Sequence, residues 1–133
     1  MREIRDQFAE LTQAYKKQLD LYKRIAEVGS QEADLISMRN LDRLLEVLKE
    51  KEGLLKQASE FELQIKVIQD LLISHFGIAN FSIPQLKLVA PSYYQDDLND
   101  LEAVVNELVP TLEQLESQER NNETMLTRYL EHT

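Results

Sequence analysis

Apolar side chains recur every three or four residues along almost the whole chain. This spacing keeps them on one face of an α-helix, because a helical turn takes about 3.6 residues. Three such stripes can be traced, in segments of roughly 35 residues each, or about 50 Å of helix. They consist of Ile4, Phe8, Leu11, Tyr15, Leu19, Tyr22 and Ile25; of Leu41, Leu44, Leu48, Leu55, Ala58, Ile65, Ile68, Leu72 and Phe76; and of Tyr94, Leu98, Leu101, Val105, Leu108, Leu112, Leu115, Leu126 and Tyr129.

The stripes predict an all-α fold. We expect residues 1–133 to form a single helical domain, because this length suffices for one modest core. The expected architecture is an elongated antiparallel three-helix bundle, coiled-coil-like, with a short extra helix between the second and third long helices. The four helices are expected at about 2–37, 41–76, 83–89 and 93–131.

The boundary between the first two helices follows from the phase of the stripes. Continuing from Ile36 by steps of four and three leads to Asn40 and Arg43, whereas the second stripe begins at Leu41 and Leu44. Asn40 is also a favourable N-cap residue. We therefore expect a short helical hairpin here. One continuous helix is the alternative.

The segment after the second stripe has a different composition. Gly77 is expected to end the second helix as its C-cap glycine. Ser82, followed closely by a proline, predicts the start of a short helix, with Leu86 and Val89 packed inward. Ser92 is expected to cap the third long helix.

Two residues interrupt the stripes. Lys51 lies where an apolar residue is expected. Its stem can cover apolar surface while the charge reaches water, which is the preferred interpretation, or it can form a polar contact that fixes the register of the helices. Pro110 lies inside the third stripe, which keeps its phase on both sides. We expect a kink at Pro110, not the end of the helix.

Composition excludes several classes of function. The net charge of −9 argues against nucleic acid and against anionic membrane surfaces, which both require basic faces. There is no cysteine, and no apolar run approaches the ~20 residues of a membrane-spanning helix. The first residues, MREIRDQF, are charged where a signal peptide is apolar. A cytoplasmic protein without membrane insertion is expected.

Nothing in the sequence predicts catalysis. The two histidines, His75 and His132, have no nucleophile or metal ligand at a useful spacing, and Glu-x-x-His motifs of dimetal bundles are missing. The aspartates at the start of the third helix suit the positive end of the helix dipole better than a metal site. We therefore expect no enzyme activity, no metal and no cofactor.

Three segments resemble one family. NLDRLLEVLKEKEGLLK, HFGIANFSIPQLKLVAP and LEQLESQERNNETMLTRYLE are similar to the second long helix, the connecting loop with its short helix, and the final helix of the FlgN-type flagellar export chaperones. Pro110 is a departure, because that helix is usually free of proline in this family. The resemblance implies an ATP-independent chaperone in the cytoplasm. Its partners would be hook–filament junction (hook-associated) proteins, bound through their helical terminal segments, and the flagellar type III export apparatus.

The last turns of the third helix supply a candidate partner-binding site. Met125, Leu126, Tyr129 and Leu130 form an apolar face that is wider than the stripe they continue. A wide apolar face suits the binding of a partner helix. The same residues would also suit the seam of a homodimer, or simply complete the core. The rival function is therefore a structural coiled-coil dimer or scaffold subunit without a client.

Overall fold

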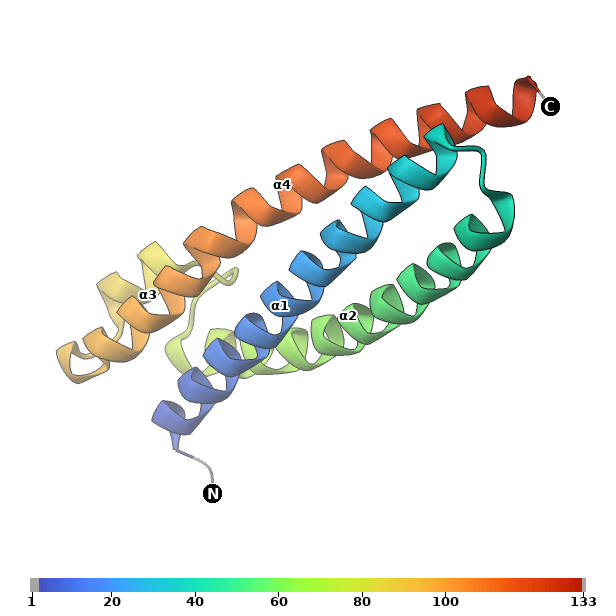
Figure 1. The fold of residues 1–133 in the computed structure, drawn as a ribbon. Coiled ribbons are helices and arrows are strands. Elements are labelled where there is room, and N and C mark those ends of the chain that lie inside the picture. Colours follow the sequence, from blue (N-terminus) through green and yellow to red (C-terminus); the bar gives the residue numbers. More distant parts are fainter. Residues whose placement is uncertain (1–2, 133) are drawn as a thin grey trace.

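The computed structural model describes residues 3–132, and every regular element among them is helical (Figure 1). The expected all-α fold is confirmed. Arg2, where the first helix was expected to begin, lies outside the described residues. The elements are α1 (Ile4–Ser37), α2 (Leu41–Phe76), α3 (Ile83–Val89), the 3₁₀ turn η1 (Ser92–Tyr94) and α4 (Gln95–Glu131).

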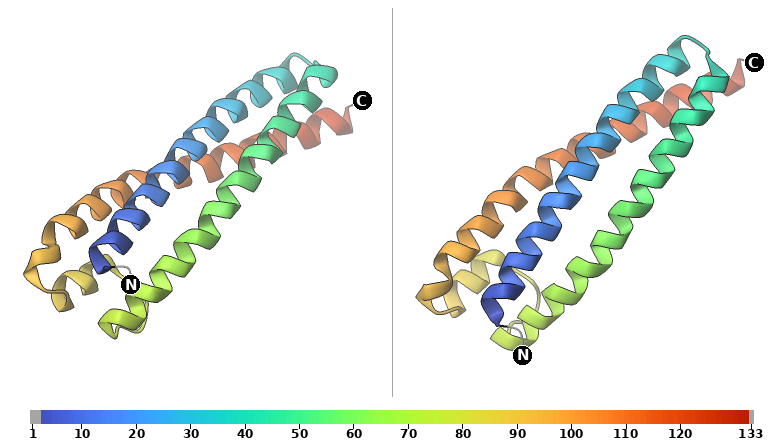
Figure 2. Two further views of the ribbon diagram at one scale, coloured as in Figure 1. Left: turned by 90° about the horizontal axis from the view of Figure 1, so that it is seen from below. Right: turned by 60° about the horizontal axis from the view of Figure 1, so that its bottom comes forward.

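The three long helices lie side by side with α1 in the middle (Figures 1 and 2). α2 runs antiparallel to α1, and α4 returns parallel to α1. α1 packs closely against both of them, whereas α2 and α4 make few direct contacts with each other. Burial follows this order, since 16 residues are buried in α1, seven in α2 and six in α4. The packing is thus more open than that of a closed bundle.

The hairpin between α1 and α2 is confirmed, and the alternative of one continuous helix is wrong. The Asn40 side chain accepts a hydrogen bond of 3.3 Å from the Arg43 backbone N–H, which caps α2. Arg39 turns the chain with φ of 56°, a left-handed conformation that is uncommon outside glycine. At its other end α2 stops at Gly77, which has φ of 67°.

The second apolar stripe proves to be two rows on different sides of α2. One row is buried, whereas Leu41 and Leu55, which were assigned to the same stripe, are exposed. The buried row has the helical spacing of three and four that a single face requires. It comprises Leu44, Val47, Leu54, Ala58, Ile65, Ile68 and Leu72.

The connection to α4 differs from expectation at two residues. Ser82 caps α3 through the Gln85 N–H, at 3.3 Å, and Leu86 is fully buried. Val89, however, is exposed, and the buried side chains of α3 are those of Ile83 and Leu86. Ser92 does not cap α4 either, since it opens the turn η1 and α4 begins only after Tyr94.

Pro110 does not end α4, which continues through it to Glu131. The ring is exposed on the helix surface, where the carbonyl that loses its usual donor can be hydrated. The continuity carries residues 111–131 of α4 as far as the hairpin between α1 and α2 (Figure 1).

Candidate partner-binding surfaces

The four residues proposed as a partner site lie together at the end of α4, but they are not equally exposed. Met125, Leu126 and Tyr129 are half-buried and pack against the core. Leu130 is 60% exposed. Three of the four residues therefore anchor the end of α4 to the core. Their remaining exposed surface adjoins the exposed side chain of Leu130.

The hairpin adds apolar surface at the same end of the molecule. Met38 is 66% exposed, and Leu41 and Leu45 in the first turns of α2 are exposed as well. The Arg39 guanidinium lies 5.5 Å from the centre of the Tyr129 ring, which ties the hairpin to α4. Sequence reasoning missed these residues because Leu41 had been assigned to the core. Their spacing beside buried Leu44 was the available signal, since neighbouring residues of a helix point in different directions.

A polar network joins all three long helices near this end. The Lys51 ammonium donates to Glu32 at 3.0 Å and to Glu119 at 2.8 Å. Burial lowers the pKa of Lys51, but the hydrogen bonds and the charges of the two glutamates outweigh it, so that the pKa is raised. The preferred interpretation of Lys51 as a solvent-reaching side chain is wrong, because its ammonium makes a polar contact with Glu32 and Glu119 inside the fold.

α4 approaches α1 closely beside this network. The Asn122 side chain is buried and donates to the Gly29 carbonyl at 2.9 Å, and Gln118 donates to the Ala26 carbonyl at 2.9 Å. A Cβ atom on Gly29 would lie 2.1 Å from the Gln118 Oε1 atom. Gly29 thus leaves room for the Gln118 side chain between the two helices.

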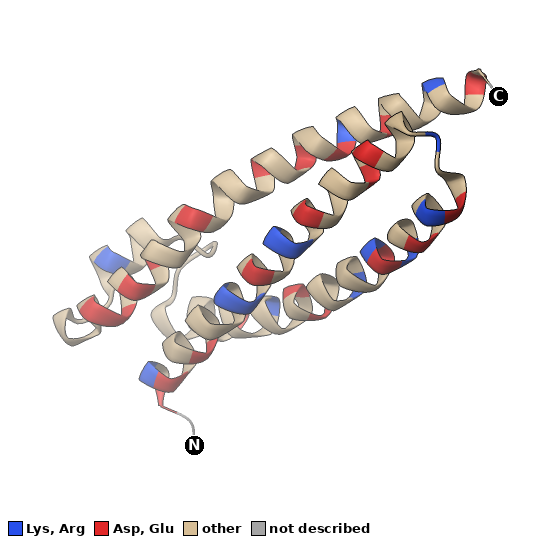
Figure 3. Cartoon of the chain, in the orientation of Figure 1, with Lys and Arg blue, Asp and Glu red and all other residues tan. Residues whose placement is uncertain are grey.

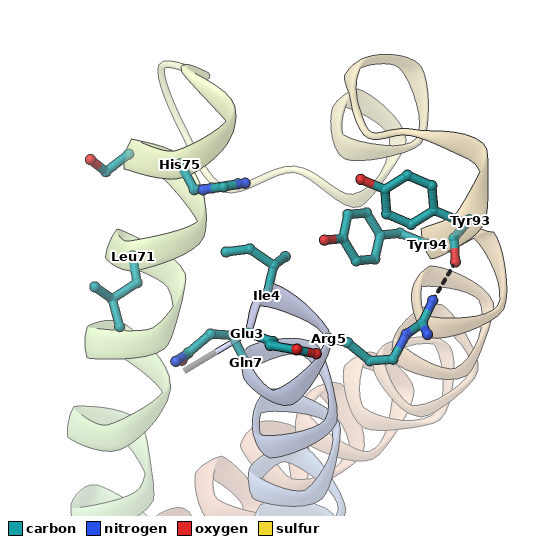
Figure 4. Close-up of a pocket in the computed structure, with 9 residues that line it drawn as sticks. Glu3, Ile4, Arg5, Gln7, Leu71, His75, Tyr93 and Tyr94 are labelled. Carbon is teal, nitrogen blue, oxygen red and sulfur yellow. Dashed lines mark hydrogen bonds between the residues drawn. The ribbon is translucent and has the colours of Figure 1, made fainter. Parts of the chain in front are cut away.

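A pocket lies at the opposite end of the molecule from the hairpin. It has a volume of about 660 Å³ and lies between the start of α1, the end of α2 and η1 (Figure 4). Ile4 and Leu71 form apolar walls, and the rings of Tyr93 and Tyr94 face them from η1. The Arg5 guanidinium donates to the Tyr93 carbonyl at 2.8 Å and pairs with Asp97. The full lining is Glu3, Ile4, Arg5, Gln7, Leu71, Ser74, His75, Tyr93 and Tyr94.

The charges on the described surface are mixed in sign. Lys and Arg are interspersed with Asp and Glu along the long helices (Figure 3). Over residues 3–132 there is no cluster of three or more histidine or acidic side chains that could hold a metal ion. No helix in the described part is long and apolar enough to cross a membrane.

Comparison with known proteins places the chain in a family. The family model described as FlgN protein matches residues 1–133. No curated protein and no solved structure matches the chain. The match covers all three segments on which the resemblance rested and agrees with the all-helical structure. The chain belongs to the FlgN family of flagellar export chaperones.

Proposed function

We propose that this protein is a cytoplasmic chaperone that binds helical terminal segments of hook–filament junction proteins and delivers them to the flagellar type III export apparatus. Binding and release need neither ATP nor a cofactor. The partner helix lies across the end of α4 and the hairpin. Its contacts are the outer surfaces of Met125, Leu126 and Tyr129, together with Leu130.

The observation that carries this proposal is that two separate segments expose apolar side chains at the same end of the molecule. Leu130 and Met38 are both mostly exposed, and the Arg39–Tyr129 contact holds their segments together. An amphipathic helix buries apolar residues spaced by three and four, and it needs a surface of more than one side chain. The half-buried residues of α4 give this surface a fixed base.

A second function is supported by the outer row of α2. Leu41, Leu45 and Leu55 are exposed at steps of four and ten residues, which are compatible with the seam of a coiled coil because ten is three plus one heptad. This row favours a homodimer or scaffold subunit as the alternative. Sedimentation of the purified chain at increasing concentration separates the two, because a scaffold already self-associates without a client.

The client site is best tested at its exposed residues. Calorimetry compares the wild type with the Leu130→Ser, Met38→Ser double variant, using a C-terminal helical peptide of a hook–filament junction protein. Each well-buried apolar anchor contributes about 1.5–3 kcal/mol, so the double variant should bind at least tenfold more weakly. Binding should depend only weakly on salt, because it is mainly apolar.

The matched control is Leu88→Ser, an exposed leucine of α3 far from the hairpin. It should bind the peptide as the wild type does. Equal affinity in the double variant would exclude this surface. The substitutions Leu126→Ser and Tyr129→Ser test the same face, but they also lower the melting temperature, since both residues pack partly on the core.

A further inference from the structure

A small pocket at the hairpin end of the molecule has a basic lining and a volume of about 250 Å³. Arg39 of the hairpin and Arg128 and His132 near the end of α4 line it, and no acidic residue of the described chain does so. The ion pairs within residues 3–132 involve other lysines and arginines, so neither guanidinium is paired with a carboxylate there. The whole chain, by contrast, has a net charge of −9. A pocket with two unpaired guanidinium groups favours an anionic ligand.

Arg39 occupies a position where glycine is the usual residue. Its backbone has φ of 56°, and the Asn40 N–H donates to the Leu35 carbonyl at 3.0 Å, which ends α1 in a Schellman motif. A side chain is sterically disfavoured at this φ, so glycine would suit the turn better. The turn therefore does not explain the arginine. Strain of this kind points to a use for the side chain.

The Arg39 side chain is already held in place for a ligand. Its guanidinium lies over the Tyr129 ring, 5.5 Å from the ring centre. A guanidinium over a ring still has N–H groups at its edge, which can form two parallel hydrogen bonds with a carboxylate. Ser37 also lines the pocket and can donate its hydroxyl hydrogen. A planar carboxylate matches these donors in number and geometry.

The pocket adjoins the proposed client surface. Met125 and Tyr129 belong to that surface and also line the pocket. Met38 and Leu130, which are both mostly exposed, directly adjoin pocket residues in the sequence. A helix bound to these apolar side chains can therefore reach the pocket with its end. The carboxyl end of a helix carries the negative pole of the helix dipole, and a chain that ends there adds its terminal carboxylate. Both are attracted to the basic lining.

We propose that this pocket binds the terminal carboxylate of the client helix, so that the client is recognised by its carboxyl end. The carboxylate accepts hydrogen bonds from the Arg39 guanidinium and pairs with Arg128. This inference rests on the proposed function, because it names the part of the client segment that reaches this end of the molecule. It adds one ionic contact to binding that remains mainly apolar.

The test is calorimetry of the full chain with two forms of one C-terminal helical peptide of a hook–filament junction protein. One form ends in the free carboxylate and the other in a carboxamide, so that only the charge of the end differs. We expect the free acid to bind about three- to tenfold more tightly, as is typical of one partly exposed ionic contact. In NMR spectra, the Arg39 Nε–H resonance should shift further with the free acid than with the carboxamide.

Two variants locate the contact. Arg39→Gly and Arg128→Gln should each weaken binding of the free acid and leave binding of the carboxamide unchanged. Arg39→Gly should also keep or raise the melting temperature, because glycine relieves the strain at this φ. An arginine with only a structural role would lower the melting temperature when it is replaced. The control is Arg24→Gln, which removes the same charge from an exposed position of α1 and should keep the preference for the free acid.

Several outcomes would overturn the proposal. Equal affinity of the free acid and the carboxamide would exclude recognition of the terminal carboxylate and leave the apolar client surface in place. An equal loss of preference in Arg24→Gln would reduce the effect to net charge. A carboxamide peptide with a glutamate added at its end that binds as tightly as the free acid would show that the pocket takes any carboxylate. Binding of neither form would overturn the proposed function itself.

Discussion

At the scale of single residues, Lys51 and Glu32 form a nearly buried ion pair. Glu32 is buried, and its carboxylate receives both the Lys51 ammonium and the Asn122 amide. Removing one partner of a buried ion pair leaves the other charge without compensation. The same argument does not hold for Lys66 and Asp70, which form an exposed pair on α2.

The substitution Lys51→Met should lower the free energy of unfolding by about 3–5 kcal/mol. The reason is the uncompensated Glu32 carboxylate, since methionine itself fills a similar volume. Lys66→Met is the control and should change stability by only about 0.5 kcal/mol or less. Urea unfolding followed by circular dichroism measures both. A cost for Lys51→Met as small as that for Lys66→Met would contradict the role assigned to the network.

Two buried tyrosines predict a loss of stability at alkaline pH. Burial, together with the charge and hydrogen bond of Glu62, raises the pKa of Tyr22 from 10.0 to about 12. Burial also raises the pKa of Tyr15. The folded state therefore holds protons that the unfolded state releases above pH 10, so stability is full below this pH and falls toward pH 12. Tyr22→Phe should show a shallower fall in urea unfolding between these values; an unchanged slope would refute the assignment.

At the scale of the helices, Pro110 is an unfavourable residue inside a continuous element. α4 is continuous, although proline cannot donate to the Asn106 carbonyl. Pro110→Ala restores this donor without disturbing the core, because the ring is exposed. The melting temperature should rise, by an amount corresponding to at most about 3 kcal/mol. An unchanged or lower melting temperature would mean that the native α4 depends on the proline.

The helices also show what a stripe can and cannot predict. The ends of α2 were predicted closely, because Asn40 and Gly77 are residues that favour the two caps of a helix. The apolar periodicity predicted the helix between them. Periodicity could not separate the two apolar rows of α2, since Leu41 and Leu44 are both leucines and their spacing of three residues fits a single helical face. Which of the two rows is buried depends on the helix that packs against α2. For the same reason, the partners of Lys51 were beyond the sequence, because they come from α1 and α4.

At the scale of the whole molecule, the central place of α1 predicts unequal protection of the helices. Backbone hydrogen bonds that are covered on several sides open only with global unfolding. Amide hydrogen exchange should therefore be slowest in the middle of α1, around Leu19 to Ile25, and faster in α3 and in the last turn of α4. NMR or mass spectrometry can measure these rates. Equal protection of α1 and α4 would indicate a closed bundle instead of this open packing.

The sequence alone was enough to propose only one of the two candidate surfaces. The end of α4 could be proposed because its apolar face is local in sequence, from Met125 to Leu130. The pocket at the α1 start could not, because its lining comes from α1, α2 and η1. Gln7 reads as an ordinary surface residue until the neighbouring helices enclose it.

The position of α1 between its two neighbours also has a consequence for synthesis. The hairpin of α1 and α2 is complete when the chain has reached Gly77, while the residues of α4 are still to be made. At about 5–20 residues per second, α4 follows several seconds later. During this interval one flank of α1 is bare and already suited to receive an amphipathic helix. We therefore expect that helices of other proteins can bind this flank of α1 until α4 has been synthesised.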